Sequence, residues 1–386
     1  MSILILLFSI LVPALLIVFF YRKNSPQPVE ERKEEPKVEE KQVKKVPKKQ
    51  VKSLKPKAPK SFTPKHELFV GALRGHFEPV TCFCWSRDGK LIATASTDRS
   101  IRVYIVSTLT SANPKCIRVS TNLEEVECMD FSEDNRYLVC AYRSSKQIGI
   151  YRLSMEGGAL FREFPIERNH YPTHLFVSGT TDRMCILVVC GDKDTVLRLY
   201  DSSGSLKARI DNAQLENYGS AFNYHRDFFA TGSFASDSKV YAISRANASR
   251  EYQKFGKAMI LSGPRSAVYD VSFDQHDRVA VVSKDGCFYI WTVDVRYQLR
   301  EDPRLLNRVE LKKEPKHVIL HPTEDIAVVT SGTDCTMFNC MTGELITSID
   351  PIAGTTIKNM SASPDGRYFA VLGTEEKQVL VWKYQG

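Results

Sequence analysis

The sequence of 386 residues lacks the common motifs of catalytic sites. It contains no G-x-x-x-x-G-K-[ST] phosphate loop, no G-x-S-x-G nucleophile elbow, no H-E-x-x-H zinc pair and no G-x-G-x-x-G dinucleotide loop. Its eight histidines are scattered along the chain. These absences argue against the hydrolases, zinc proteases and nucleotide-binding enzymes that depend on those motifs. We therefore expect a protein that is not an enzyme, with no catalytic residue, no cofactor and no metal.

Cysteines with metal-ligand spacing are also scarce. All ten cysteines follow residue 80, at irregular intervals and mostly within apolar strand-like segments. Cys82 and Cys84 are two residues apart, so they share one face of a strand and could be two metal ligands. No second pair with zinc spacing exists, which favours core packing and a reducing compartment.

Charge is absent from residues 3–21, a run of 19 positions interrupted only by Ser9 and Pro13. As a helix this run reaches about 28 Å, close to the hydrocarbon thickness of a bilayer. A cleaved signal peptide is the competing interpretation. It would need a basic segment before Ile3 and small residues at a cleavage site, and neither is present. We expect residues 1–21 to be a transmembrane signal anchor.

The residues after this run indicate the orientation of the anchor. Tyr21, Arg22 and Lys23 are expected at the membrane interface, and residues 22–65 hold 15 Lys and Arg against 6 Glu. Such a basic flank stays on the cytoplasmic side, so the rest of the chain should be cytosolic on a single-pass anchor. The short span suits a thin bilayer such as that of the endoplasmic reticulum.

Acidic residues are missing from Lys41 to Lys65, where four prolines hold the chain extended. Residues 22–65 are therefore expected to be a disordered Lys/Pro-rich linker. Residues 66–386 carry 38 basic and 39 acidic side chains, so the excess positive charge belongs to the linker alone. This linker could be a spacer, or it could contact anionic lipid or RNA phosphates, and the sequence leaves these possibilities open.

The remainder of the chain contains a segment that recurs seven times. Each copy is a run of alternating apolar residues, a turn, and a closing strand that ends in an aromatic residue. The closing aromatics are Tyr104, Tyr151, Tyr200, Tyr241, Trp291, Phe338 and Trp382. Their spacings of 47, 49, 41, 50, 47 and 44 residues are typical of propeller blades.

Turn residues stand between the strand-like runs, as in Asp88-Gly89, Asp134-Asn135 and Asp365-Gly366. With the Gly75-His76 pair in the first copy, this pattern resembles the WD-repeat β-propeller family. The fold expected for residues 66–386 is an all-β, seven-bladed WD-repeat β-propeller. Because little chain follows Trp382, we expect the strand-like run from His66 to Leu73 to complete the last blade and close the ring.

The resemblance also assigns structural roles. In WD repeats, a histidine such as His76 hydrogen-bonds to an aspartate such as Asp98 and stabilises the blade. Asp194 and Asp285 lie at the same distance from a closing aromatic as Asp98 does. All three aspartates are expected to hold tight turns through side-chain bonds to the backbone.

In the WD-repeat family, partners often bind the face that carries these aspartate turns and the loops that enter the blades. By position, that face should include the following residues: Phe77, Glu78, Thr97, Lys193, Arg265 and Lys284. Several of these are charged or aromatic, types that can carry binding energy, although ordinary solvated loops have the same composition.

The order of anchor, linker and propeller resembles that of membrane-tethered WD-repeat proteins of the endoplasmic reticulum. The resemblance implies a non-catalytic scaffold that recruits cytosolic or membrane proteins, among them the stress-response kinase of translation initiation factor 2 (an eIF2 kinase), or translation components. The alternatives are an RNA- or ribosome-binding module and a GTPase regulator. Another class of tethered propeller, the exchange factors, carries its anchor after the propeller, whereas this chain has the opposite order.

Overall fold

The computed structural model describes residues 62–111, 113–180, 183–191, 193–214, 216–245 and 252–384. The anchor predicted for residues 1–21 lies outside the described residues, as does the linker up to residue 61. In the part of the chain that is described, no helix combines the length and the apolar character needed to cross a membrane.

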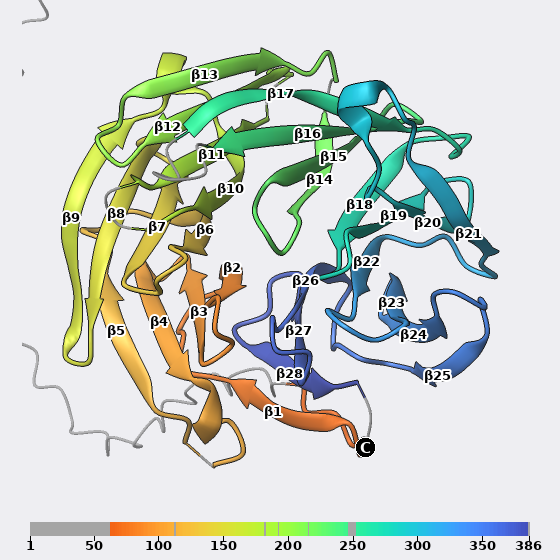
Figure 1. The fold of residues 1–386 in the computed structure, drawn as a ribbon. Coiled ribbons are helices and arrows are strands. Elements are labelled where there is room, and N and C mark those ends of the chain that lie inside the picture. Colours follow the sequence, from red (N-terminus) through yellow and green to blue (C-terminus); the bar gives the residue numbers. More distant parts are fainter. Residues whose placement is uncertain are drawn as a thin grey trace, which may run out of the picture. The chain divides into compact units, whose positions relative to one another are not determined.

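The described chain forms 28 strands, arranged in four-stranded antiparallel units that we call blades (Figure 1). Blade 1 contains β2 (Val80–Trp85), β3 (Leu91–Ser96), β4 (Ser100–Ile105) and β5 (Cys116–Ser120). Blade 2 contains β6 (Val126–Phe131), β7 (Tyr137–Tyr142), β8 (Gln147–Ser154) and β9 (Gly157–Pro165). Blade 3 contains β10 (Pro172–Ser178), β11 (Cys185–Cys190), β12 (Val196–Asp201) and β13 (Leu206–Asp211).

The later blades repeat the same order of strands. Blade 4 contains β14 (Asn217–Phe222), β15 (Phe228–Ser233), β16 (Ser238–Arg245) and β17 (Tyr252–Leu261). Blade 5 contains β18 (Val268–Phe273), β19 (Arg278–Ser283), β20 (Cys287–Thr292) and β21 (Arg304–Glu310). Blade 6 contains β22 (His317–Leu320), β23 (Ile326–Ser331), β24 (Asp334–Asn339) and β25 (Leu345–Ile349). Blade 7 contains β26 (Ile357–Ala362), β27 (Tyr368–Gly373), β28 (Val379–Lys383) and β1 (Phe69–Leu73).

Blades 1 and 2 are joined into one eight-stranded sheet, whereas the other five blades are separate sheets. A single parallel bridge between Val119 of β5 and Gly158 of β9 makes the junction. A Cβ atom on Gly158 would lie only 2.6 Å from Val119 Cγ2, so the bridge depends on glycine. Since one bridge does not merge the two cores, we count seven blades.

The first strand completes the last blade, as the sequence predicts. β1 pairs antiparallel with β28, with Phe69 opposite Trp382 and Leu73 opposite Val379. The strand is shorter than the predicted run, because Phe69 N donates to His66 O at 3.1 Å in a turn that precedes it. The pairing covers the outer edge of β28 and ties the start of the propeller to its end.

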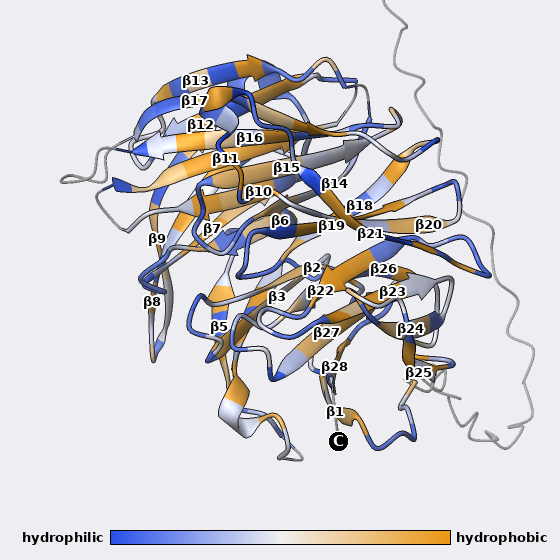
Figure 2. Cartoon of the chain, turned by 45° about the vertical axis from the view of Figure 1, so that its right-hand side comes forward, coloured by the Kyte–Doolittle hydropathy of each residue, from blue (hydrophilic) through white to orange (hydrophobic). Residues whose placement is uncertain are grey.

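The hydrophobic core lies between blades. Each neighbouring pair of blades, including blades 7 and 1, shares its own cluster of buried apolar side chains. All seven closing aromatics lie in the third strand of their blades, and Trp382 and Tyr104 are fully buried in two of these clusters. Figure 2 shows the hydrophobic colour concentrated along the strands. The sequence period therefore records the positions that pack against the preceding blade.

The predicted turns also occur where hairpins need them. Asp88-Gly89, Asp134-Asn135 and Asp365-Gly366 connect the first and second strands of blades 1, 2 and 7. Gly89, Asn135 and Gly366 have positive φ angles of 67°, 58° and 72°. Glycine and asparagine adopt this conformation at low cost, which is why they mark such turns.

Candidate functional site

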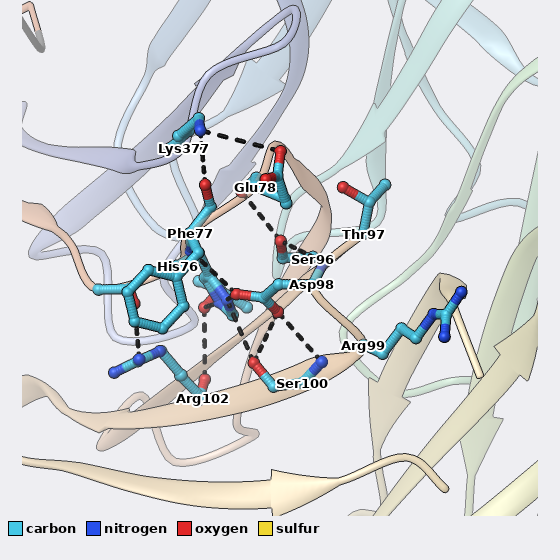
Figure 3. Close-up of polar contacts among 12 residues, drawn as sticks. His76, Phe77, Glu78, Ser96, Thr97, Asp98, Arg99, Ser100, Arg102 and Lys377 are labelled. Carbon is cyan, nitrogen blue, oxygen red and sulfur yellow. Dashed lines mark hydrogen bonds and ion pairs between the residues drawn. The ribbon is translucent and has the colours of Figure 1, made fainter. Parts of the chain in front are cut away.

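A hydrogen-bonded network surrounds Asp98 in the turn between β3 and β4 (Figure 3). Its Oδ1 accepts bonds from Ser100 N at 3.1 Å and from Ser100 Oγ at 2.7 Å. Its Oδ2 accepts a bond from Phe77 N at 3.0 Å and lies 3.0 Å from His76 Nδ1. On the other side of the imidazole, His76 Nε2 lies 2.9 Å from Thr94 Oγ1. The network joins the loop that enters blade 1 to two strands of that blade.

A hydroxyl, an imidazole and a carboxylate in this order resemble the relay of a serine hydrolase. The hydroxyl here belongs to Thr94, which is 1% exposed in the middle of β3. A nucleophile must reach its substrate, and Thr94 is covered by the blade itself. The network therefore holds the blade together instead of presenting a nucleophile.

The protonation states of this network follow from burial and hydrogen bonding. Burial lowers the pKa of His76 and outweighs the opposite effect of the Asp98 carboxylate. Burial alone would raise the pKa of Asp98, but the bonds from Ser100, the Phe77 amide and His76 lower it overall. At neutral pH the network is a neutral imidazole beside a carboxylate.

Arg102, four residues after Asp98, lies beside the network without pairing with Asp98. Its Nη2 donates to Gly75 O at 2.6 Å, and its side chain is buried. Gly75 has a φ of 129°, and a Cβ atom there would lie 2.6 Å from Arg102 Nη1. The Gly75-His76 pair thus combines a backbone conformation that only glycine adopts easily with an imidazole that hydrogen-bonds to Asp98.

Asp285 of blade 5 holds its turn in nearly the same way. Its Oδ1 accepts from Cys287 N at 3.1 Å, and its Oδ2 accepts from Arg265 N at 2.8 Å. Blade 5 has no histidine in this place, and Tyr289 Oη donates to Asp285 Oδ2 at 2.7 Å instead. Burial raises the pKa of Asp285, but these bonds lower it overall.

Asp194 of blade 3 has a different partner. Its Oδ1 accepts from Val196 N at 3.2 Å, which holds the turn, while its Oδ2 pairs with Nη1 of Arg198. The Arg198 side chain is 2% exposed and also donates from Nε to Glu167 Oε2 at 3.2 Å. Glu167 in turn pairs with the exposed Arg209. Blade 3 therefore contains a buried ion pair where blade 1 contains a hydrogen-bonded histidine. A histidine is also near Asp194, but His170 Nδ1 lies 3.7 Å from its Oδ2, beyond hydrogen-bond distance.

The residues expected to bind partners lie in two kinds of connection, the loops that enter a blade and the turns between its second and third strands. In an antiparallel blade these connections share one end, which we call the Asp-turn face. Phe77 is 75% exposed, and Glu78, Lys193, Arg265 and Lys284 are exposed as well. Thr97 is half-buried, and its amide donates to Pro79 O at 3.0 Å. The six residues belong to blades 1, 3 and 5, so they surround the face without forming one cluster.

Two exposed apolar residues on the Asp-turn face are absent from the sequence prediction. Leu123, in the loop that enters blade 2, is 77% exposed, and Phe234, in the turn between β15 and β16, is 68% exposed. Large apolar side chains with this exposure are candidates for partner contact. Both follow a strand or turn without breaking its pattern, so the sequence gives no signal that separates them from core residues.

The first strands of all seven blades line a central channel of about 450 Å³. Its wall includes His174, Asp270 and Lys358, together with apolar residues such as Phe176 and Phe222. At the end opposite the Asp-turn face, Arg87 of blade 1 reaches across to blade 4, where it bonds to Tyr224 O and lies 5.3 Å from the Tyr224 ring centroid. This cross-channel contact narrows that end of the channel.

The remaining sequence expectations concern metals, thiols and the membrane. Within the described ranges, no group of three or more His, Cys, Asp or Glu side chains could hold a metal ion. Cys82 is buried, which raises the pKa of its thiol to about 12, whereas Cys84 is half-buried on the channel wall. The predicted interface residues Tyr21, Arg22 and Lys23 lie outside the described residues.

Comparison with known proteins agrees with the geometry. The family model for the WD domain, G-beta repeat, matches residues 67–104 and 256–292. Transducin beta-like protein 2 of Homo sapiens is 25% identical over 319 residues, which cover 80% of this chain and 70% of that protein. The Mus musculus protein of the same name is 24% identical over 318 residues, covering 80% of this chain and 71% of its own.

Two further similarities are weaker. The poly(A)+ RNA export protein of Schizosaccharomyces pombe is 22% identical over 240 residues, which cover 61% of this chain and 64% of that protein. Among solved structures, the β-propeller domain of Myceliophteria thermophila Cps50 (Swd1) has a TM-score of 0.61 at 12% identity, covering 82% of this chain and 99% of that one. At that identity the likeness concerns the fold alone.

Proposed function

Because the chain is a WD-repeat β-propeller protein that resembles transducin beta-like protein 2, we propose that it is a membrane-tethered, non-catalytic scaffold. The observation that carries the proposal is the Asp-turn face, where buried networks fix the turns while charged and apolar side chains such as Phe77 and Lys193 stay exposed. A rigid turn that presents an exposed side chain suits binding, because little order is lost when a partner docks.

The proposed location is the endoplasmic reticulum membrane, with the propeller in the cytosol. Support comes from the uncharged run at residues 3–21 and from the 15 basic residues against 6 acidic ones in residues 22–65. The resemblance supports an eIF2 kinase of the stress response, or translation components, as the recruited partners. The anchor would concentrate such partners at the membrane, because binding to a tethered surface raises their local concentration.

The proposed orientation can be tested with microsomes that contain the full chain. Protease added outside intact vesicles should digest the propeller, and detergent should not be needed for this. Asn247 and Asn359, which lie in glycosylation acceptor patterns, should carry no glycan. Protection of the propeller until detergent is added, or endoglycosidase-sensitive mass on the native chain, would overturn the orientation.

The binding face can be tested with the triple variant Lys193→Ala, Arg265→Ala and Lys284→Ala. These side chains are exposed, so the variant should keep the wild-type melting temperature and lose partners in a pull-down of the full chain. The matched control is Lys90→Ala, Arg136→Ala and Arg367→Ala, which removes three exposed basic side chains from the opposite end. Equal recovery of every partner by both triple variants would reject the Asp-turn face as the principal site.

RNA binding through the linker is a second candidate function. Two observations favour it, namely the absence of acidic residues from Lys41 to Lys65 and the similarity to a poly(A)+ RNA export protein. Lysines that neutralise phosphates make affinity fall steeply with salt. Deleting residues 41–60 should abolish a salt-sensitive affinity for single-stranded RNA while partner recruitment by the Asp-turn face persists. RNA affinity that is unchanged by the deletion would contradict this role.

A further inference from the structure

Two tyrosines from neighbouring blades meet at the rim of the channel on the Asp-turn face. Tyr218 lies in β14 and Tyr269 in β18, strands that contact each other beside the channel (Figure 1). Their ring centroids are 5.9 Å apart. The close approach depends on Gly219, since a Cβ atom there would lie 2.6 Å from Asp270 Cα and 2.9 Å from Tyr269 O.

Carboxylates hold both tyrosine hydroxyls. Tyr218 Oη donates to Glu216 Oε2 at 3.0 Å, and Tyr269 Oη donates to Glu314 Oε1 at 2.9 Å. The rings are therefore fixed in orientation, and each has a negative charge at its polar end. A fixed aromatic face next to carboxylates is a favourable environment for an organic cation.

A lysine of the chain itself already lies over the face of one of these rings. Lys316 Nζ lies 3.8 Å from the Tyr269 ring centroid and donates to Glu314 Oε1 at 2.7 Å. The Lys316 side chain is 46% exposed, so it can leave the ring for water at low cost. Tyr218 is 39% exposed, and its ring is accessible from the same side of the molecule.

An apolar contact is available beside this pair. Ser233 of β15 pairs with Asn217, the residue before Tyr218, and the next residue is Phe234, which is 68% exposed. A partner segment that places a cation on the tyrosines would therefore find an aromatic side chain next to them. A central anchor with an apolar neighbour is the usual composition of an interface hot spot.

We propose that Tyr218, Tyr269, Glu216 and Glu314, together called the tyrosine site, bind a lysine or arginine side chain of a partner protein in place of Lys316. The proposal deepens the scaffold function, on which it rests, by naming the chemistry that the partner presents. Lys316 acts as an internal competitor, which keeps the site filled until a basic segment arrives.

The test uses the full chain in nonionic detergent micelles and fluorescein-labelled pentalysine as the probe, with binding followed by anisotropy at low salt. The double variant Tyr218→Leu and Tyr269→Leu should weaken binding about three- to tenfold, because it removes both aromatic faces. Tyr269→Phe keeps the ring and should stay within about twofold of the wild type. Melting temperatures of both variants show whether the propeller is intact.

Removal of the internal competitor gives the sharper readout. Lys316→Met should tighten pentalysine binding about threefold or more, since it vacates Tyr269 and Glu314. Lys312→Met is the matched control. Lys312 is an exposed lysine four residues before Lys316, and its replacement changes the net charge by the same amount. An equal effect of the two lysine variants would show that only net charge matters and would overturn the proposal. So would full pentalysine binding by a folded Tyr218→Leu and Tyr269→Leu variant.

The two proposals can fail separately. If the tyrosine variants bind pentalysine normally while the Lys193, Arg265 and Lys284 triple variant loses its partners, the tyrosine site is wrong and the scaffold stands. If the tyrosine variants lose pentalysine while the triple variant keeps every partner, the tyrosine site stands and the rest of the proposed face is wrong.

Discussion

Blades 1 and 3 carry an aspartate in the turn between their second and third strands and an arginine four residues later, yet the two pairs differ. In blade 1, the His76 imidazole hydrogen-bonds to the Asp98 carboxylate, and Arg102 donates to the backbone carbonyl of Gly75. In blade 3 the arginine pairs directly with the aspartate, so Arg198 and Asp194 form a buried ion pair. The turn is thus held by a hydrogen-bonded network around a neutral imidazole in blade 1 and by an ion-pair network in blade 3.

The group that binds the turn aspartate, whether neutral or charged, therefore sets how much of a blade's stability comes from ionic interactions. The His76 network contains one ion, and its partners are neutral donors, so removing one donor leaves a carboxylate with other bonds. The Arg198 network contains two buried charges, Arg198 and Asp194, and Arg198 also pairs with the less buried Glu167. Variants of the two networks should therefore differ in magnitude, and the following predictions run from the largest effect to the smallest.

Replacement of Arg198 should be the most damaging change. Arg198→Met leaves the Asp194 carboxylate, whose side chain is 5% exposed, without its buried guanidinium partner, and only His170, 3.7 Å away, remains beside it. We expect a loss of about 3 to 5 kcal/mol in unfolding free energy, measured by denaturant titration of the full chain in micelles. The control Arg209→Met removes a side chain that is 58% exposed and shares Glu167, and it should cost at most about 1 kcal/mol. Similar losses in the two variants would mean that the buried pair is not the stabilising element.

Amide replacements of the aspartates compare the networks directly. Asp98→Asn and Asp285→Asn should each cost about 1 kcal/mol, since the amide oxygen can still accept from the turn and loop amides. The two losses should be nearly equal, because Asp98 and Asp285 hold corresponding backbone groups. Asp194→Asn should cost more than either, because it removes the more buried of the two carboxylates that pair with Arg198. The comparison is wrong if Asp98→Asn proves to be the most destabilising of the three.

The pH dependence of stability should show the smallest difference. His76 has a lowered pKa in the folded state, so its unfolded form binds a proton first as the pH falls. Its contribution is therefore complete above about pH 6.5 and declines as the pH drops towards the folded pKa. His76→Gln should remove this pH-dependent contribution to stability. When the pH is lowered from 7.5 to 5.5, the melting temperature of the variant should therefore fall less than that of the wild type. A larger fall in the variant would contradict the sign.

The period of the repeats could be predicted because the buried positions of each strand show in the pattern of neighbouring residues. Alternation within a strand, a turn residue and a closing aromatic recur in every blade, and all seven aromatics lie in third strands. The closing strand was also predictable, since a strand-like run from His66 to Leu73 precedes the first repeat. Such features depend on residues that are near each other in the chain.

The blades, their order, the closing strand and the positions of the aspartates could therefore be predicted from the order of residues along the chain. Which group contacts each aspartate followed only from the tertiary structure, because an arginine stands four residues after both Asp98 and Asp194 and yet only Arg198 pairs with its aspartate. The same holds for Tyr218 and Tyr269, which are brought together by the packing of two blades at Gly219. Contacts between blades depend on how closely two backbones approach, and a periodic pattern along one chain carries no record of that distance.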